Sequence, residues 1–332
     1  MTADAESPRR VMFESDANGI TLVSVAVYSV LRNSDRSRPV DILMAHDDTF
    51  VAAGGKAKIE NVVKRFPHAT VEFSDFMPIY KPLARRLERA DTRWPPMVWG
   101  WVFCDRLFPG VGGKIVYIDL DTYVTGDLQE LFDVDLASGG HLMAMVAESR
   151  RPDDDFCNVK WTTSDPALYN TGVILLDIDA WRREDMAMKI ADWFAEHRED
   201  VPFVEQDAAN FVCQGRILRL PLKWNYNDNS LRSLGKVDVK GGTLFEGLHP
   251  PREAIEAMAY PKIVHYMFTH KPDRYNHRPE RNLFRRAMIE LGMTSYRLPG
   301  ETLPRLIEGW LHDMKHSILR RRARRMFSAF RG

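Results

Sequence analysis

Pairs of aspartates separated by one residue are the clearest pattern in this sequence that could carry chemistry. In a loop, such a pair can present both carboxylates to one divalent cation, with phosphate oxygens filling the other positions. The spacing occurs at Asp119/Asp121, Asp133/Asp135, Asp153/Asp155 and Asp177/Asp179. Only Asp119 and Asp121 follow a clear apolar run, 115–118, without a helix start directly after them. They are the candidate metal-binding pair, whereas we expect Asp179 to cap a helix that begins at Ala180.

A strand-terminal aspartate pair suits two kinds of chemistry. In aspartate-nucleophile phosphatases of the haloacid-dehalogenase type, the pair normally lies on the first strand and the motif has Thr or Val in its fifth position. Here Tyr123 holds that position, and at least three strand-like runs precede the pair. In nucleotide-sugar transferases the pair binds a metal on the donor diphosphate and lies in the middle of the chain. The position of Asp119 and Asp121 therefore favours a transferase, with a phosphohydrolase as the alternative.

Short apolar runs that alternate with amphipathic stretches must position this pair. The periodicity predicts strands at 11–13, 40–44, 70–73, 115–118, 141–146, 172–176 and 262–266. It predicts helices at 20–31, 56–66, 180–197 and 205–211. This alternation is typical of an α/β fold with a mostly parallel sheet, in which ligands bind beyond the carboxyl ends of the strands. Asp16 and Asn18, just past the first strand, are therefore candidate binding residues.

The composition is that of a globular chain with unevenly distributed charge. Its 332 residues are 45% hydrophobic and contain 46 Lys and Arg against 46 Asp and Glu, which excludes collagen-like, disordered and disulfide-scaffold classes. Three widely spaced cysteines form no metal or redox motif, and no signal peptide or membrane span is evident, so we expect a cytoplasmic location. Residues 301–332 hold eight Lys and Arg against three acids, which leaves the rest of the chain net acidic.

Several ordered motifs between residues 11 and 275 resemble glycosyltransferase family eight, the retaining enzymes that include glycogenin and bacterial lipooligosaccharide galactosyltransferases. The sequence KIVYIDLDTYVTG at 114–126 resembles the family's metal motif, and residues 265–272 resemble its HxxGxxKP element. The resemblance implies a GT-A-type fold and a site for Mn²⁺ or Mg²⁺ formed by Asp119, Asp121 and His265. Imidazole, two carboxylates and phosphate oxygens are a suitable ligand set for Mn²⁺. Lys271 would then meet the donor diphosphate.

The same resemblance assigns further residues to the donor site. Residues 11–18 are similar to the family's first strand and uridine-binding turn, which places Asp16 and Asn18 near uracil and ribose. The segment YNTGV at 169–173 is similar to the family's FN(S/A)GV, and residues 205–207 are similar to its DQD. The implied catalytic residues are Gln206, Asn170 and Glu205. The implied donor-binding residues are Asp16, Asn18, Asp119, Lys271 and Glu148, the last of which matches an acid that contacts sugar hydroxyls.

Two departures from the family pattern motivate another hypothesis. Gly19 stands where many members have an aromatic residue on uracil, and Phe268 replaces the Gly of HxxGxxKP. A degenerate protein that binds a UDP-sugar without catalysis is therefore a further alternative. No residue is an unambiguous nucleophile, so we expect front-face substitution assisted by the leaving phosphate. The aromatic segments 94–101 and 224–227 have compositions suited to sugar rings, although core packing is the expected role of any single Trp.

The last thirty residues differ from the rest of the chain. Apolar residues recur there at helical spacing, and residues 314–332 carry seven Lys and Arg and no acid. A basic amphipathic helix of this kind is typical of an anchor on anionic lipid. We therefore expect a GT-A-type catalytic domain at 1–300 and a helical tail at 301–332, peripheral on the inner face of the membrane. The predicted reaction moves a hexose, galactose or glucose, from a UDP-sugar to a glycan such as lipopolysaccharide or a lipid-linked acceptor, without nucleic-acid binding.

Overall fold

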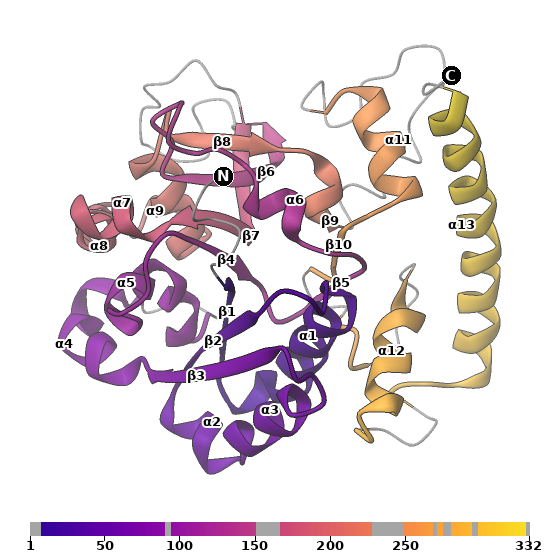
Figure 1. Ribbon diagram of the computed structural model, residues 1–332, viewed down its shortest axis with the longest axis horizontal. Coiled ribbons are helices and arrows are strands. Elements are labelled where there is room, and N and C mark those ends of the chain that lie inside the picture. Colours follow the sequence, from indigo (N-terminus) through magenta and orange to yellow (C-terminus); the bar gives the residue numbers. More distant parts are fainter. Residues whose placement is uncertain are drawn as a thin grey trace. The chain divides into compact units, whose positions relative to one another are not determined.

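The structure, a computed structural model, describes residues 8–89, 94–150, 167–227, 249–267, 271–274, 280–293 and 298–329 (Figure 1). The chain forms two compact units. The first takes Met1–Ile20, Arg36–Ile118 and Gln129–Leu220, and the second takes Thr21–Asp35, Asp119–Leu128 and Pro221–Gly332. Each unit therefore joins segments that are far apart in the sequence. A boundary at residue 300 between a catalytic domain and a tail stays a prediction.

A seven-stranded sheet forms the centre of the first unit. Its strands are β1 (Arg9–Ser15), β2 (Val40–His46), β3 (Ala69–Asp75), β4 (Lys114–Ile118), β6 (Met143–Arg150), β7 (Ala167–Asp177) and β8 (Ile217–Leu220). The order is β3-β2-β1-β4-β7-β6-β8. Among these strands β7 runs antiparallel to both its neighbours, and the other pairs are parallel. This confirms the predicted α/β fold with a mostly parallel sheet. Val11, Met12 and Phe13 of β1 are buried, as expected of a central strand.

Helices of the first unit pack against this sheet and each other. They are α2 (Asp48–Ala52), α3 (Gly55–Val63), α4 (Met77–Leu87), α5 (Cys104–Leu107), α6 (Gln129–Phe132), α7 (Ile178–Arg183), α8 (Met186–His197) and α9 (Val204–Val212). Three short 3₁₀ helices accompany them, η2 (Ala17–Gly19), η3 (Pro96–Trp99) and η4 (Trp101–Phe103). Figure 1 shows α3 beside β3, and α7 and α9 next to β7, with which they are in contact. The strand that carries residues 169–173 is thus in contact with the helix that carries Gln206.

The predicted helix at 180–197 is wrong in two details. It is divided into α7 and α8, because Asp185 between them adopts a left-handed φ of 51°, which a continuous helix cannot contain. The N-cap of α7 is Asp177, whose Oδ1 accepts a hydrogen bond from the backbone N of Ala180 at 2.9 Å. Asp179 instead accepts from the backbone N of Gly113 at 2.7 Å. Its carboxylate therefore joins two segments of the chain rather than capping the helix.

A small sheet and several helices make up the second unit. The sheet contains β5 (Thr122–Val124), β9 (Tyr226–Asn227) and β10 (Ile263–His265), in the order β5-β10-β9. The helices are α1 (Ile20–Asn33), η5 (Leu222–Trp224), α11 (Pro251–Ala259), α12 (Arg281–Glu290) and α13 (Leu303–Ala329). Two side chains of α1 form hydrogen bonds with the backbone of Val124 in β5. Ser29 Oγ accepts from Val124 N at 2.9 Å, and Asn33 Nδ2 donates to Val124 O at 3.0 Å. Trp224 and Tyr226 are buried, which confirms core packing for that aromatic segment.

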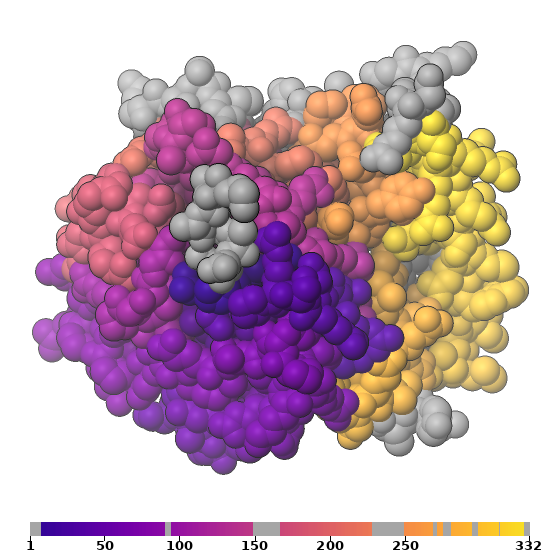
Figure 2. Space-filling view, viewed as in Figure 1, coloured from indigo at the N-terminus to yellow at the C-terminus, as the bar shows by residue number. Residues whose placement is uncertain are grey.

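The long helix α13 packs along α11 through one face. Ala323 and Phe327 join a buried apolar cluster with Ile255, Met258 and Ala259. Arg320 Nη1 pairs with Glu280 Oε1 at 3.0 Å on the same side. In Figure 2 the yellow surface of α13 lies beside the orange surface of α11. The predicted C-terminal helix is therefore present. No helix in the described part of the chain combines the length and apolarity needed to cross a bilayer.

Candidate functional site

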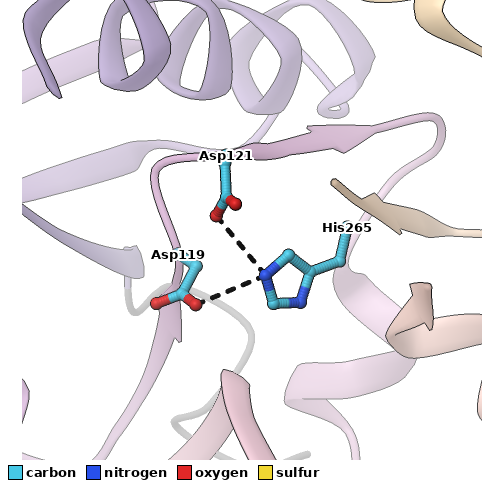
Figure 3. A group of neighbouring side chains, drawn as sticks. All are labelled: Asp119, Asp121 and His265. Carbon is cyan, nitrogen blue, oxygen red and sulfur yellow. Dashed lines mark ion pairs between the residues drawn. The ribbon is translucent and has the colours of Figure 1, made fainter. Parts of the chain in front are cut away.

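Asp119, Asp121 and His265 come together in the second unit (Figure 3). One ligand atom from each lies within 4.8 Å of the others. His265 Nε2 is 3.4 Å from Asp119 Oδ2 and 3.4 Å from Asp121 Oδ1. The antiparallel pairing of β10 with β5 produces this arrangement, because it sets His265 opposite Thr122, the residue after Asp121. The structure thus unites all three predicted metal ligands, which we call the metal trio.

Asn225 holds the imidazole of His265 from the side opposite the carboxylates. Its Oδ1 lies 3.0 Å from His265 Nδ1, and both side chains are buried. A carbonyl oxygen requires Nδ1 to carry the proton, which leaves the lone pair of Nε2 directed at the two carboxylates. Metal-binding histidines commonly have such a partner. The sequence reasoning missed Asn225, because no motif marks an asparagine whose role depends on the histidine that lies opposite it.

Lys271 adds positive charge beside the metal trio, as its Nζ forms an ion pair with Asp121 Oδ2. Burial alone would raise the pKa of Asp121, but Lys271 and His265 outweigh burial and hold this pKa well below its usual range. Burial lowers the pKa of His265, while Asp121 and then Asp119 raise it, so that the net change is upward. The two carboxylates thus attract positive charge to this point. Two carboxylates and an oriented imidazole nitrogen fit a divalent cation such as Mn²⁺.

We expect Asn225→Leu to lower the affinity for Mn²⁺ by about 10- to 100-fold, because the imidazole loses the partner that sets its tautomer and orientation. Titration calorimetry with MnCl₂ measures this affinity. Asn282→Leu is the matched control, since Asn282 is an exposed asparagine that contacts Asp313 in the same unit. Equal Mn²⁺ affinity in the Asn225 variant and the wild type would show that Asn225 does not support the site.

A second group of predicted residues meets in the first unit. Asn170 Nδ2 donates to Glu148 Oε2 at 2.8 Å and to Gln206 Oε1 at 3.3 Å. Thr171 donates to the same Gln206 oxygen from its backbone N at 3.2 Å and from its Oγ1 at 3.3 Å. These four residues, Glu148, Asn170, Thr171 and Gln206, form what we call the polar cluster. Thr171 was not singled out from the sequence, because its role depends on the packing of α9 against β7.

The hydrogen bonds of the polar cluster determine which end of the Gln206 amide meets a ligand. Three donors occupy its carbonyl oxygen, whereas its Nε2 makes no hydrogen bond to any residue that the structure describes. The helix itself is anchored by Asn210, which exchanges two hydrogen bonds of 2.8 Å with the backbone of Tyr169. Gln206 is half-buried, so its two N–H donors are available to an acceptor group such as a hydroxyl oxygen.

Asp207 lies beneath the polar cluster and is 3% exposed. Burial raises the pKa of Asp207 from its ordinary 3.8 to about 7, the hydrogen bond from Phe203 N opposes this, and the charge of Glu148 adds to it. Between about pH 4 and pH 7 the folded protein therefore binds more protons than the unfolded chain, and stability falls as the pH rises. Above about pH 7 Asp207 is charged in both the folded and the unfolded state, so the free-energy cost of burying its charge no longer changes with pH.

We expect Asp207→Asn to remove this part of the pH dependence and to stabilise the protein at pH 8. The gain is of the order of 4 kcal/mol, at about 1.4 kcal/mol for each pH unit between the two pKa values. The amide oxygen can still accept from Phe203 N, so the local fold is retained. Melting temperatures of both proteins at pH 5 and pH 8 measure the effect. Parallel pH profiles would refute it, and Asp133→Asn, at an exposed position, serves as the control.

The remaining predicted residues occupy separate places. Asp16 follows β1 and caps η2, where its Oδ1 accepts from Asn18 N at 2.9 Å and Gly19 N at 3.1 Å. Asn18 is exposed in this turn, and its Nδ2 lies 3.3 Å from Asp16 Oδ2. Glu205 is half-buried in the first turn of α9, directly before Gln206. Contact of these residues with a donor stays a prediction, and Phe268 lies outside the described residues.

Known proteins with similar sequences point to one family. The sequence profile described as "Glycosyl transferase family 8" matches residues 10–276. General stress protein A of Bacillus subtilis is 25% identical over 161 residues, which are 48% of this chain and 52% of that protein. Glycosyltransferase GlyB of Streptococcus pneumoniae is 28% identical over 155 residues, 46% of this chain and 33% of that protein. The chain thus spans about half or less of the length of these relatives.

Solved structures share the fold. Galactosyltransferase LgtC, determined in complex with donor and acceptor sugar analogues, superposes with a TM-score of 0.67 at 15% identity. The superposition covers 86% of this chain and 97% of LgtC. Most of the chain therefore follows a fold known from this kind of protein, and the family profile includes both the metal trio and the polar cluster. On this evidence the chain belongs to glycosyl transferase family 8.

Proposed function

We propose that this protein is a metal-dependent retaining glycosyltransferase that moves a hexose from a UDP-sugar to a glycan acceptor. The observation that carries the proposal is the metal trio, in which Asp119, Asp121 and an oriented His265 converge on one point. Membership of glycosyl transferase family 8 supports the reaction class. The complex of LgtC with donor and acceptor sugar analogues supports the substrate class, and galactose is the first hexose to test.

The metal trio and the residues around it have different parts in this proposal. A bound Mn²⁺ or Mg²⁺ would neutralise the negative charge that develops on the leaving diphosphate. Asp119, Asp121 and His265 would hold the ion, while Asn225 keeps the imidazole in the tautomer that offers Nε2. Lys271 would supply a further positive charge to the phosphate oxygens, at the cost of its ion pair with Asp121. Asp16 and Asn18 would contact the uridine.

The polar cluster would bind the donor sugar. The two N–H groups of Gln206 would donate to sugar oxygens, Glu148 would accept from a hydroxyl, and Asn170 would hold both in place. An LgtC active-site mutant with Gln replaced by Glu has been solved, which supports an active-site role for a glutamine in this fold. Three donors occupy the carbonyl oxygen of Gln206, which makes it a poor nucleophile. Front-face substitution assisted by the leaving phosphate is therefore the proposed route to retention.

A panel of nucleotide sugars with and without Mn²⁺ tests the function. We expect UDP-galactose or UDP-glucose to raise the melting temperature in a metal-dependent manner and to be hydrolysed slowly to UDP. GDP- and CMP-sugars should do neither. Absence of any shift with every UDP-sugar would sink the proposal. Release of phosphate from simple phosphomonoesters would instead support the phosphohydrolase, and tight UDP-sugar binding without turnover would indicate a protein that has lost catalysis.

We further propose that α13 attaches the protein to an anionic membrane that displays a lipid-linked or lipopolysaccharide-type acceptor. The face of α13 away from α11 carries large apolar side chains that are between 38% and 71% exposed: Leu303, Leu306, Ile307, Trp310, Leu311, Met314 and Ile318. Eighteen residues complete five helical turns, so exposed Arg321 and Arg325 continue the line of Leu303 and Ile307. An apolar stripe that ends in arginines suits insertion below anionic headgroups. The protein would then lie peripherally on the inner face of the membrane.

A further inference from the structure

A cavity of about 230 Å³ lies in the first unit, outside the polar cluster and the metal trio. The end of α4, the segment that leads into η3 and the start of α9 form its walls. Its lining includes Tyr80, Leu87, Glu88, Trp94, Trp99 and Val204. Sites for drug-sized ligands occupy roughly 300–1,000 Å³, so this cavity suits a single ring rather than a large molecule.

The walls of the cavity combine aromatic surface with one carboxylate. The indole of Trp94 is 36% exposed at the rim, and Trp99 is buried behind it. Tyr80 OH donates to Glu88 Oε1 at 3.3 Å. Burial and the nearby Glu88 raise the pKa of Tyr80 to about 12, so this hydroxyl stays protonated. A pyranose ring matches such walls, because its C–H face packs on aromatic carbon while its hydroxyls donate to a carboxylate.

Hydrogen bonds tie the end of α4, which forms one wall of this cavity, to the end of α8 and to the segment before α9. Arg198, at the end of α8, donates from Nη1 to Arg85 O and to Glu88 O, both at 3.0 Å. Arg89 Nη1 donates to Val201 O, which ties the end of α4 to the segment before α9. Trp99 packs edge-on against Phe194 with ring centroids 4.9 Å apart. A cavity with fixed walls binds a ligand without the cost of ordering them.

The cavity lies at the start of the helix that carries Gln206. Val204 is the first residue of α9, and Gln206 follows two residues later. At 100° for each residue, the side chains of Val204 and Gln206 lie about 200° apart around the helix. The cavity is therefore close to the polar cluster along the chain but faces another side of α9. It offers a place for a second sugar ring, on another side of α9 from the one that Gln206 would bind.

We propose that this cavity is a subsite for a pyranose ring of the acceptor glycan, with Trp94 as the surface on which the ring stacks and Glu88 as the acceptor for its hydroxyls. The assignment of the ring to the acceptor rests on the proposed glycosyltransferase function. Binding of a pyranose by the cavity does not depend on that function, so the two can fail separately.

Saturation-transfer NMR with methyl glycosides of glucose, galactose and N-acetylglucosamine tests the subsite. We expect at least one glycoside to receive saturation at its ring protons from the wild type. Trp94→Ala should reduce that transfer about tenfold, as for an anchor residue, and Glu88→Gln should reduce it while preserving shape. Tyr260→Ala is the control, since Tyr260 is 46% exposed on the second unit and should leave the transfer unchanged. Melting temperatures show whether each variant is folded.

Transfer kinetics then assign the bound ring. With a galactosyl or glucosyl donor and an oligosaccharide acceptor, Trp94→Ala and Glu88→Gln should raise the KM for the acceptor far more than the KM for the donor. No saturation transfer from the wild type, or equal transfer from the wild type and a folded Trp94→Ala, would overturn the subsite. If saturation transfer requires Trp94 but the protein hydrolyses no nucleotide sugar, the sugar subsite is supported and the proposed glycosyltransferase function is refuted.

Discussion

Asp121→Asn should lower Mn²⁺-stimulated hydrolysis of a UDP-sugar by at least about 10³-fold. Asp121 is 3% exposed and its carboxylate faces both His265 and Lys271, so its charge acts directly at the metal trio. The amide keeps the shape of the carboxylate but removes its charge. A metal ion contributes several kcal/mol of transition-state stabilisation, and about 4 kcal/mol corresponds to this factor. Initial rates of UDP release across a MnCl₂ series measure the loss.

A matched control separates the metal trio from acidic residues in general. Asp133→Asn alters another aspartate of an Asp-x-Asp pair, but Asp133 is exposed and lies at the end of α6. We expect hydrolysis and Mn²⁺ affinity of this control to equal those of the wild type. Calorimetric titration of Asp121→Asn with MnCl₂ should show affinity reduced together with the rate. Wild-type affinity and rate in a folded Asp121→Asn protein would contradict both the metal site and the proposed function.

Replacing Ile307, Trp310 and Leu311 together by Ser should lower binding to anionic vesicles by about 100-fold. Each of these side chains is more than half exposed on α13. Burial of one such side chain contributes about 1.5–3 kcal/mol, so half insertion of three contributes about 2–4.5 kcal/mol, a range that includes the roughly 3 kcal/mol that 100-fold requires. Their removal leaves the face with Ala323 and Phe327 intact. Co-sedimentation with vesicles of phosphatidylglycerol and phosphatidylcholine, compared with phosphatidylcholine alone, measures the effect.

Two further variants sharpen this experiment. Val51→Ser removes an isolated apolar side chain that is 43% exposed on α2, and it should not change vesicle binding. Arg321→Gln with Arg325→Gln should chiefly weaken the preference for anionic lipid, at about 1 kcal/mol for each charge. Unchanged vesicle binding by the triple variant would refute the membrane proposal. If donor hydrolysis fell in proportion to vesicle binding, α13 would be part of the catalytic body rather than an attachment.

Most strands and many helices could be predicted because they depend on local periodicity. The runs at 40–44 and 115–118 are buried on both faces in β2 and β4, and such runs are recognisable without knowing their neighbours. The helix α4 was missed, since Pro82 inside it contradicts the usual sequence signs of a helix. The division of α7 from α8 at Asp185 was also missed. The left-handed backbone of Asp185 arises from packing on either side and has no sequence signature comparable to a glycine.

The residues of the candidate site also divide into those that motifs predict and those that only the structure identifies. Asp119, Asp121 and His265 could be named from motifs, because metal ligands need particular side chains at particular strand ends. Asn225 and Thr171 could not, since asparagine and threonine are common and their roles arise only from the atoms that lie opposite them. The apolar spacing of α13 likewise predicted an amphipathic helix, but it did not tell which apolar residues pack on α11 and which remain exposed.

The sequence by itself determined the α/β class, the order of the elements, the family resemblance and the identity of the three candidate metal ligands. These properties follow from residue types and from spacings within one strand or helix. The tertiary structure alone decided the antiparallel direction of β7, the orientation of the His265 ring and the Gln206 amide, the exposed face of α13 and the cavity beside Trp94. Each of these depends on contacts between residues far apart in the chain, and a strand's direction or an amide's orientation is set by the partner that it meets.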